Sequence, residues 1–156
     1  GECSACCFTH SVARAAVPVT KMFEWCSHCS QGAGCLIYES RPKSCQSYRC
    51  FWLSYPLKDE MRPDRWGIII DVWKIPNETL KLLNVWECIE GRYKASDIQE
   101  MIEGFIALGN YVIAGRPMNR EQDLRFPADM NEADQHRFVN AAVQELESRQ
   151  DAAAAG

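Results

Sequence analysis

This sequence lacks the long apolar runs and the dense basic segments that would place a protein in a membrane or on a nucleic acid. No apolar stretch approaches the roughly 20 residues that span a bilayer. The first residues do not show the basic and then apolar order of a secretory signal peptide. The net charge is -4, and no basic stripe of the kind that binds phosphate is present. We therefore expect a cytoplasmic protein that binds neither membranes nor nucleic acids.

Several catalytic patterns are missing as well. The sequence has no paired carboxylates, no glycine-rich phosphate loop and no nucleophile elbow, so it indicates neither hydrolysis nor nucleotide chemistry. Histidine is scarce, and His10 and His136 have no partner at helical spacing, so we expect both on the surface. These patterns leave open whether the protein is an enzyme.

Cysteine, in contrast, is abundant and clustered. The chain of 156 residues has nine cysteines, and eight of them lie in its first 50 residues: Cys3, Cys6, Cys7, Cys26, Cys29, Cys35, Cys45 and Cys50. Cys88 stands alone in an apolar segment, where we expect it to pack as a small hydrophobic side chain. A chain of this length can bury a core without crosslinks. That length, the odd total and the missing signal peptide all disfavour a disulfide framework.

The spacing of the clustered cysteines is typical of metal ligation. Two cysteines separated by two residues can turn both sulfurs toward one centre, as at structural zinc sites and in iron–sulfur ligation. Cys3 and Cys6 have this spacing, and so do Cys26 and Cys29. Eight thiols allow two four-thiolate sites, one shared binuclear site, or a four-cysteine cluster with spare thiols. We favour zinc as the metal, with iron or an iron–sulfur cluster as the alternative.

Basic and aromatic residues are interleaved with the last three cysteines. A zinc ion held by four thiolates has a net charge of about -2, which three basic residues can offset: Arg41, Lys43 and Arg49. Four aromatic residues are expected to form an apolar shell that limits solvent access to the metal: Tyr38, Tyr48, Phe51 and Trp52. His28 lies between two stronger thiolate donors, so we expect it to point outward or to donate a hydrogen bond rather than to bind the metal.

The segments "CSACC", "WCSHC" and "GCLIYESRPKSCQSYRCFWL", followed by "RPDRWGIII", resemble the zinc- or iron-chelating cysteine-cluster family of YkgJ-like proteins. The resemblance covers about residues 3 to 70. It implies that the first family motif is matched by Cys3, Cys6 and Cys7, the central pair by Cys26 and Cys29, and the final triplet by Cys35, Cys45 and Cys50. The family motif usually has one more cysteine upstream, and glycine is common where Ser4 stands. The resemblance implies metal binding through these cysteines and no particular reaction.

Polar residues and two prolines between Pro56 and Trp66 separate two regions of the chain. We expect residues 1–55 to form a cysteine-cluster metal-binding module and residues 56–156 to form a small α+β part that packs with it as a single domain. β-branched and aromatic residues predict strands in the segments 66–73, 85–93 and 111–115. We therefore expect an α+β fold in which the metal-binding module packs on a small antiparallel sheet with two or more helices.

Helical periodicity predicts two helices. The first covers residues 96–110, where Ser96 and Gln99 have the spacing of a capping box and Gly109 suits the C-terminal stop. The second covers residues 132–149, with Phe138, Ala142 and Leu146 on one stripe, and the last six residues are expected to fray. Between them, the segment 116–130 is expected to be a surface loop.

Two functions follow from these patterns. In the first, the protein holds zinc or an iron or iron–sulfur centre through clustered cysteine thiolates, in a structural or metal-handling role, with a protein partner docking on its acidic C-terminal part. In the alternative, it is a redox protein whose iron–sulfur cluster transfers electrons or senses oxygen.

Overall fold

The computed structural model describes residues 2–10, 22–74, 81–116 and 121–154. The fold is α+β, as expected from the sequence. Its elements in chain order are α1 (Cys6–Thr9), β1 (Cys29–Ser30), β2 (Gly34–Cys35), η1 (Tyr38–Ser40), α2 (Lys43–Ser47), α3 (Phe51–Ser54), η2 (Asp59–Met61), α4 (Pro63–Trp66), β3 (Ile68–Lys74), β4 (Lys81–Glu87), η3 (Arg92–Lys94), α5 (Ser96–Ala107), β5 (Tyr111–Arg116), β6 (Glu121–Arg125) and α6 (Glu132–Ala154).

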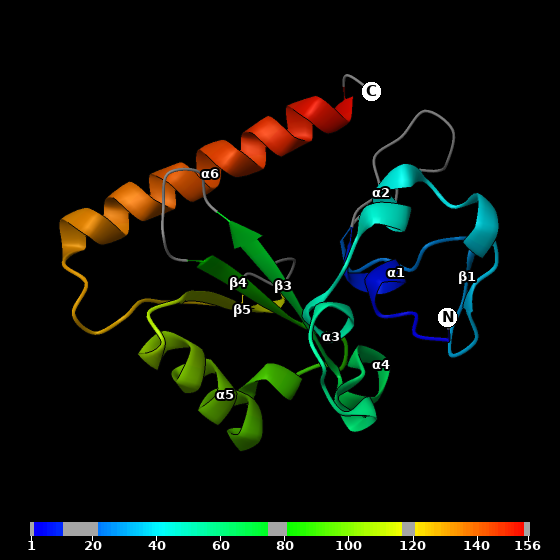
Figure 1. Cartoon of the computed structure of the whole chain (residues 1–156), viewed down its shortest axis with the longest axis horizontal. Helices are drawn as coiled ribbons and strands as arrows, with labels where there is room; N and C mark the ends of the chain where they lie inside the picture. Colours follow the sequence, from blue (N-terminus) through cyan, green and yellow to red (C-terminus); the bar gives the residue numbers. More distant parts are fainter. Residues whose placement is uncertain (1, 11–21, 75–80, 117–120, 155–156) are drawn as a thin grey trace.

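The central sheet has the strand order β3-β4-β5-β6 (Figure 1). β3 pairs antiparallel with β4, and β5 pairs antiparallel with β6. β4 and β5 run parallel, with Leu82 opposite Tyr111. The expected antiparallel sheet is therefore mixed, because η3 and α5 form a helical crossover that brings the chain back to start β5 beside the start of β4.

One face of the sheet packs on α5. Ile68 and Ile70 of β3 are buried in one cluster with Ile98 and Ile102 of α5. The helix follows the expected segment, but the predicted capping box does not form. The N-cap position is Ala95, which makes no side-chain cap, and the Gln99 amide donates instead to the carbonyl of Tyr93.

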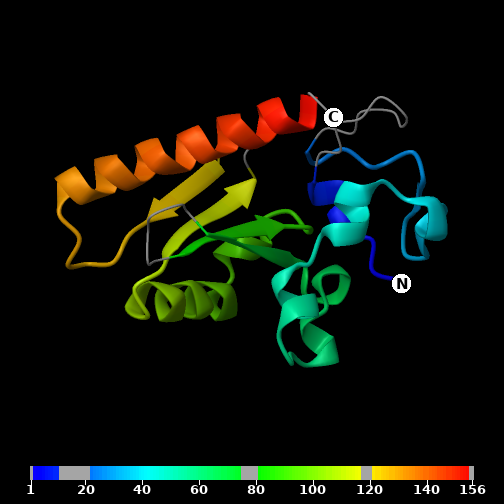
Figure 2. The same cartoon turned by 45° about the horizontal axis from the view of Figure 1, so that its top comes forward.

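The other face of the sheet is shared between α6 and the cysteine-rich segment. Phe138 of α6 is fully buried, and its ring stacks on Tyr111 of β5 with the centroids 3.6 Å apart. Farther along the same face, Ile69 and Trp86 pack against Ala5 and Cys50 of the cysteine-rich segment. Figure 2 shows the resulting arrangement, with α6 above the sheet, α5 below it and the blue and cyan segment at one end.

Two expected segments differ from the structure. The strand expected at 85–93 begins earlier, at Lys81, and ends at Glu87, because the chain turns at Gly91 with a φ of 75°. The loop expected at 116–130 contains strand β6, which pairs with β5. Its residues "EQDLR" lack the apolar alternation that marks a strand, because β6 lies at the edge of the sheet.

The C-terminal end of α5 agrees with the prediction, whereas that of α6 does not. Gly109 has a φ of 81°, the left-handed conformation expected of a residue that stops α5. Helix α6 continues to Ala154, beyond the expected end at residue 149. Ala142 of α6 is buried in the same cluster as Phe138, as the predicted stripe requires, while the side chain of Leu146 lies outside the described residues. No helix among the described residues is long and apolar enough to cross a membrane.

Candidate metal centre

The first three cysteines lie in and just before the short helix α1. Backbone hydrogen bonds form this turn: Cys7 N donates to Ser4 O at 2.9 Å, and Thr9 N donates to Ala5 O at 3.0 Å. Ala5 is 3% exposed and packs against the sheet. The turn therefore holds Cys3, Cys6 and Cys7 close to the sheet.

The central pair of cysteines is held by a small hairpin. Cys29 N donates to Cys26 O at 2.9 Å, which closes a turn between the two cysteines. Strands β1 and β2 then place Cys29 directly opposite Cys35. Gly32 and Gly34, with φ values of 80° and 102°, allow the tight reversal between the strands. The Cys26 amide also donates to Cys7 O at 3.0 Å, so the hairpin is bonded to the segment that carries the first motif.

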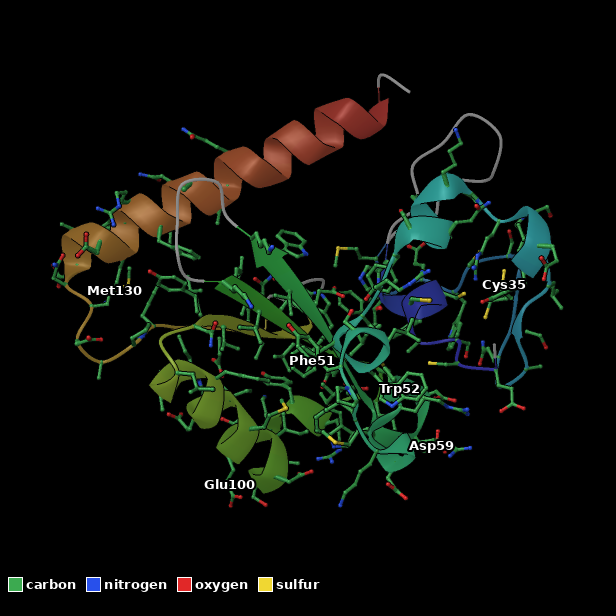
Figure 3. The ribbon with its side chains drawn as sticks, in the orientation of Figure 1. Cys35, Phe51, Trp52, Asp59, Glu100 and Met130 are labelled. Carbon is green, nitrogen blue, oxygen red and sulfur yellow. The ribbon has the colours of Figure 1, made fainter. Side chains whose placement is uncertain are left out.

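The last two cysteines belong to the helical segment that follows. Pro42 is the N-cap of α2, and Cys45 lies within that helix. Cys50 is the N-cap of α3 and is 4% exposed, packed against the sheet residue Ile69. Figure 3 places Cys35 on the outer loop and Phe51 and Trp52 beside the sheet, so the cysteine-rich segment extends outward from the sheet.

These segments enclose an open cavity of about 580 Å³. Seven of the cysteines line it: Cys3, Cys6, Cys7, Cys26, Cys35, Cys45 and Cys50. The eighth predicted ligand, Cys29, is not part of the lining, and it lies opposite Cys35 in the hairpin of β1 and β2. Cys88 packs against the same apolar cluster as Cys3 and Cys6, in agreement with its expected packing role. The structure thus brings seven of the eight predicted ligands to one cavity.

The cavity does not contain a finished coordination shell. Within residues 2–10, 22–74, 81–116 and 121–154, no group of three or more histidine, cysteine, aspartate or glutamate side chains has the geometry to hold a metal ion. All nine cysteines are free thiols. The donor chemistry nevertheless fits a thiophilic metal, since thiolates are the ligands that zinc and iron–sulfur centres take.

Burial controls the ionisation of the thiols in this region. It raises the pKa of Cys3 to about 11, and it is also the main cause of the raised pKa values of Cys45 and Cys50. Cys6 differs, because the thiol of Cys7 donates to it and lowers its pKa, while the same bond raises the pKa of Cys7. Neutral thiols must lose their protons when a metal binds, so binding at this cavity releases protons.

A polar network that the sequence did not predict lies at the wall of the cavity. Asp71 of β3 is 4% exposed, and it accepts hydrogen bonds from the Tyr48 hydroxyl and from Nε2 of His10. The other ring nitrogen of His10 lies 2.7 Å from the hydroxyl oxygen of Thr9, which donates to Ala5 O. Both nitrogens of His10 are therefore engaged within the protein, and neither is free to bind a metal.

His10 is thus not the surface residue that was expected, although His136 is exposed as expected. The sequence contains one indication of this network, which is the acidic residue Asp71 inside the apolar run "IIIDVW". A buried carboxylate needs hydrogen-bond donors, which here come from residues far apart in the sequence. Burial, followed by the charge of Asp71, raises the pKa of Tyr48, so its hydroxyl stays protonated and donates.

The aromatic shell forms in part. Tyr38, Tyr48 and Trp52 line the cavity, together with Arg41, Arg49 and His28. Phe51 faces away from it, because its ring contacts Phe105 of α5 with the centroids 5.7 Å apart. Lys43 is exposed and is not part of the lining. Of the three basic residues expected near the cysteines, the cavity therefore has two.

No family model matches the chain, and the comparisons with curated proteins and with solved structures gave no match.

Proposed function

We propose that this protein binds zinc through its clustered cysteine thiolates, in a structural or metal-handling role. The observation that carries the proposal is the lining of one cavity by seven cysteines that come from separate turns of the chain. Soft thiolate donors select zinc, copper(I) or iron–sulfur centres over the hard cations magnesium and calcium. The resemblance to YkgJ-like proteins points to the same residues as ligands.

Metal binding would complete the packing of this region. A tetrahedral zinc site with Zn–S bonds of about 2.3 Å has its sulfurs roughly 3.8 Å apart. The seven thiols that line an open cavity of about 580 Å³ cannot all lie this close to one another. The elements that carry the cysteines are short, from two to five residues. Such segments can close around an ion, and in sites of this kind metal binding and folding are coupled.

An iron–sulfur redox protein is the second candidate. The observation in its favour is the size of the cavity, since a polynuclear cluster needs more room between its thiolates than a single ion does. Three aromatic residues on the cavity wall would limit access of water and oxygen to such a cluster.

The free thiols also bear on location and partners. Nine unpaired cysteines are typical of a reducing compartment, which supports a cytoplasmic location as part of this proposal. A metal-handling role requires a protein that delivers or accepts the ion, and the exposed outer loop around Cys35 is the part of the cysteine-rich segment farthest from the sheet (Figure 3).

Elemental analysis of anaerobically purified protein, with a visible spectrum of the same sample, tests the proposal. Colourless protein with stoichiometric zinc is the expected result. Brown protein with iron and acid-labile sulfide would favour the redox candidate. Cys45→Ser should lower the metal content, whereas Cys88→Ser serves as the matched control and should keep it. Wild-type protein free of zinc and iron after anaerobic purification, and unable to bind either when they are added, would contradict both candidates.

A further inference from the structure

The cavity that the cysteines line also has an apolar wall. Beside the thiols it is lined by apolar side chains, among them Ile37, Pro42, Trp52 and Leu53. Its volume of about 580 Å³ lies within the range of roughly 300–1,000 Å³ found for pockets that take small organic molecules. These apolar side chains cannot bind a metal, so they are available to contact an organic group beside the thiolates.

Two of the three arginines on this wall already have partners. Arg62 donates to Asp64 from Nε at 2.7 Å and from Nη2 at 3.0 Å, and its Nη1 lies 3.3 Å from a carboxylate oxygen of Glu2. Arg49 donates from Nη1 to the backbone carbonyls of Gln46 and Tyr48, at 2.9 Å and 2.8 Å. Neither guanidinium therefore has its full set of donors available for a ligand.

Arg41 is different, because it is held in place without an anionic partner. Its Cζ lies 3.7 Å from the centroid of the Tyr38 ring, so the ring supports the guanidinium as a cation–π platform. Its Nε is buried and has no hydrogen-bond partner among the described residues. No described carboxylate lies within ion-pair distance of Arg41. A buried N–H without a partner is unfavourable unless a ligand satisfies it.

We propose that Arg41 anchors a small organic carboxylate in this cavity, beside the cysteine thiolates. A guanidinium presents parallel N–H donors that match the two oxygens of a carboxylate, and stacking on Tyr38 fixes the plane of that fork. One free cation matches one carboxylate charge, and the apolar wall contributed by Ile37 and Leu53 receives the hydrocarbon part of the molecule. The inference rests on the proposed function only in that the metal-binding thiols line the same cavity.

Calorimetric titration of the full-length, metal-loaded protein with phenylacetate tests this inference, with phenylacetamide as the neutral probe of the same shape. We expect saturable 1:1 binding of phenylacetate and at least about tenfold weaker binding of the amide, because the guanidinium loses its charged partner. Arg41→Gln should weaken phenylacetate binding by a similar factor. Lys43→Gln removes the same charge two residues away, outside the cavity lining, and should leave binding unchanged.

Three results would overturn the inference. They are no phenylacetate binding up to millimolar concentration, equal binding of acid and amide, and unchanged binding in Arg41→Gln. Inorganic phosphate that competes as well as phenylacetate would contradict the assignment to a carboxylate. Elemental analysis of each sample distinguishes failure of this inference from failure of the proposed function. Full metal content without phenylacetate binding overturns the carboxylate site alone. Phenylacetate binding without metal contradicts metal binding alone.

Discussion

The imidazole Nε2 of His10 lies 2.7 Å from Oδ2 of Asp71, across 61 positions of the sequence. This contact joins the cysteine-rich segment to β3, an edge strand of the four-stranded sheet. Asp71 also accepts from the hydroxyl of Tyr48, and the rings of His10 and Tyr48 are 4.4 Å apart at their centroids. One buried carboxylate therefore fixes two segments of the cavity wall against the sheet.

Removal of this carboxylate should destabilise the protein strongly. Asp71→Ala leaves His10 and Tyr48 without their acceptor in a buried position, and we expect a loss of about 3 kcal/mol in the free energy of unfolding. Tyr48→Phe removes one hydrogen bond and should cost about 1 kcal/mol. Urea unfolding monitored by tryptophan fluorescence measures both. An Asp71→Ala protein within about 0.5 kcal/mol of wild type would show that the network does not hold the two parts together.

Phe138 is the largest fully buried side chain on the described part of α6. Phe138 is 1% exposed and stacks on Tyr111, so Phe138→Ala should lower the free energy of unfolding by about 3–5 kcal/mol. Val143 lies on the same helix and is 45% exposed. Val143→Ala is the matched control and should change the free energy of unfolding by no more than about 0.5 kcal/mol. Similar losses in the two variants would mean that α6 is not docked through Phe138.

Two glycines should respond to alanine in opposite directions. Gly67 ends α4 with a φ of 79°, and an added Cβ would lie 3.0 Å from Cδ1 of Ile89. Gly67→Ala should therefore destabilise the protein by at least about 1–2 kcal/mol. Gly104 lies on an exposed turn of α5, where a Cβ meets nothing within 4 Å. Gly104→Ala should raise the thermal midpoint and increase the free energy of unfolding by roughly 0.5–1 kcal/mol. A more stable Gly67→Ala protein would contradict the left-handed conformation of Gly67.

The start of α5 gives a prediction about pH. Arg92 donates to both carboxylate oxygens of Asp97, at 2.7 Å and 2.6 Å, and these bonds lower the pKa of Asp97 to about 2. Because this folded-state pKa lies below the unfolded value, the ion pair stabilises the fold above about pH 4. That contribution is lost as the pH falls through about 2. NMR titration of the Asp97 carboxyl should show the low midpoint, and Arg92→Gln should return it to near 3.8.

Strands and helices with a strong local pattern could be predicted from the sequence. The run of isoleucines in β3 and the periodicity of α5 both depend on residues close together in the chain. Strand β6 could not be predicted, because a polar edge strand forms through its pairing with β5 and not through its own composition. The parallel pairing of β4 with β5 likewise depends on where the crossover returns the chain.

In the candidate site, too, some features follow from nearby residues in the sequence and others depend on contacts between distant segments. The clustering of cysteines in the sequence singled out the seven thiols that line the cavity, together with Cys29, which does not. The role of His10 could not be predicted, because its partner is 61 residues away. Arg41 was expected near the thiols, but its stacking on Tyr38 and its unpartnered Nε depend on the fold of the cavity wall.

The proposed function requires that cysteine sulfurs from this cavity bind the metal. X-ray absorption spectroscopy at the metal edge of anaerobically purified protein tests it most directly, because the first shell reports the ligand atoms themselves. We expect a shell of sulfur neighbours at about 2.3 Å, with fewer sulfurs or less bound metal in Cys45→Ser. A first shell made of nitrogen and oxygen, unchanged in Cys45→Ser, would contradict it.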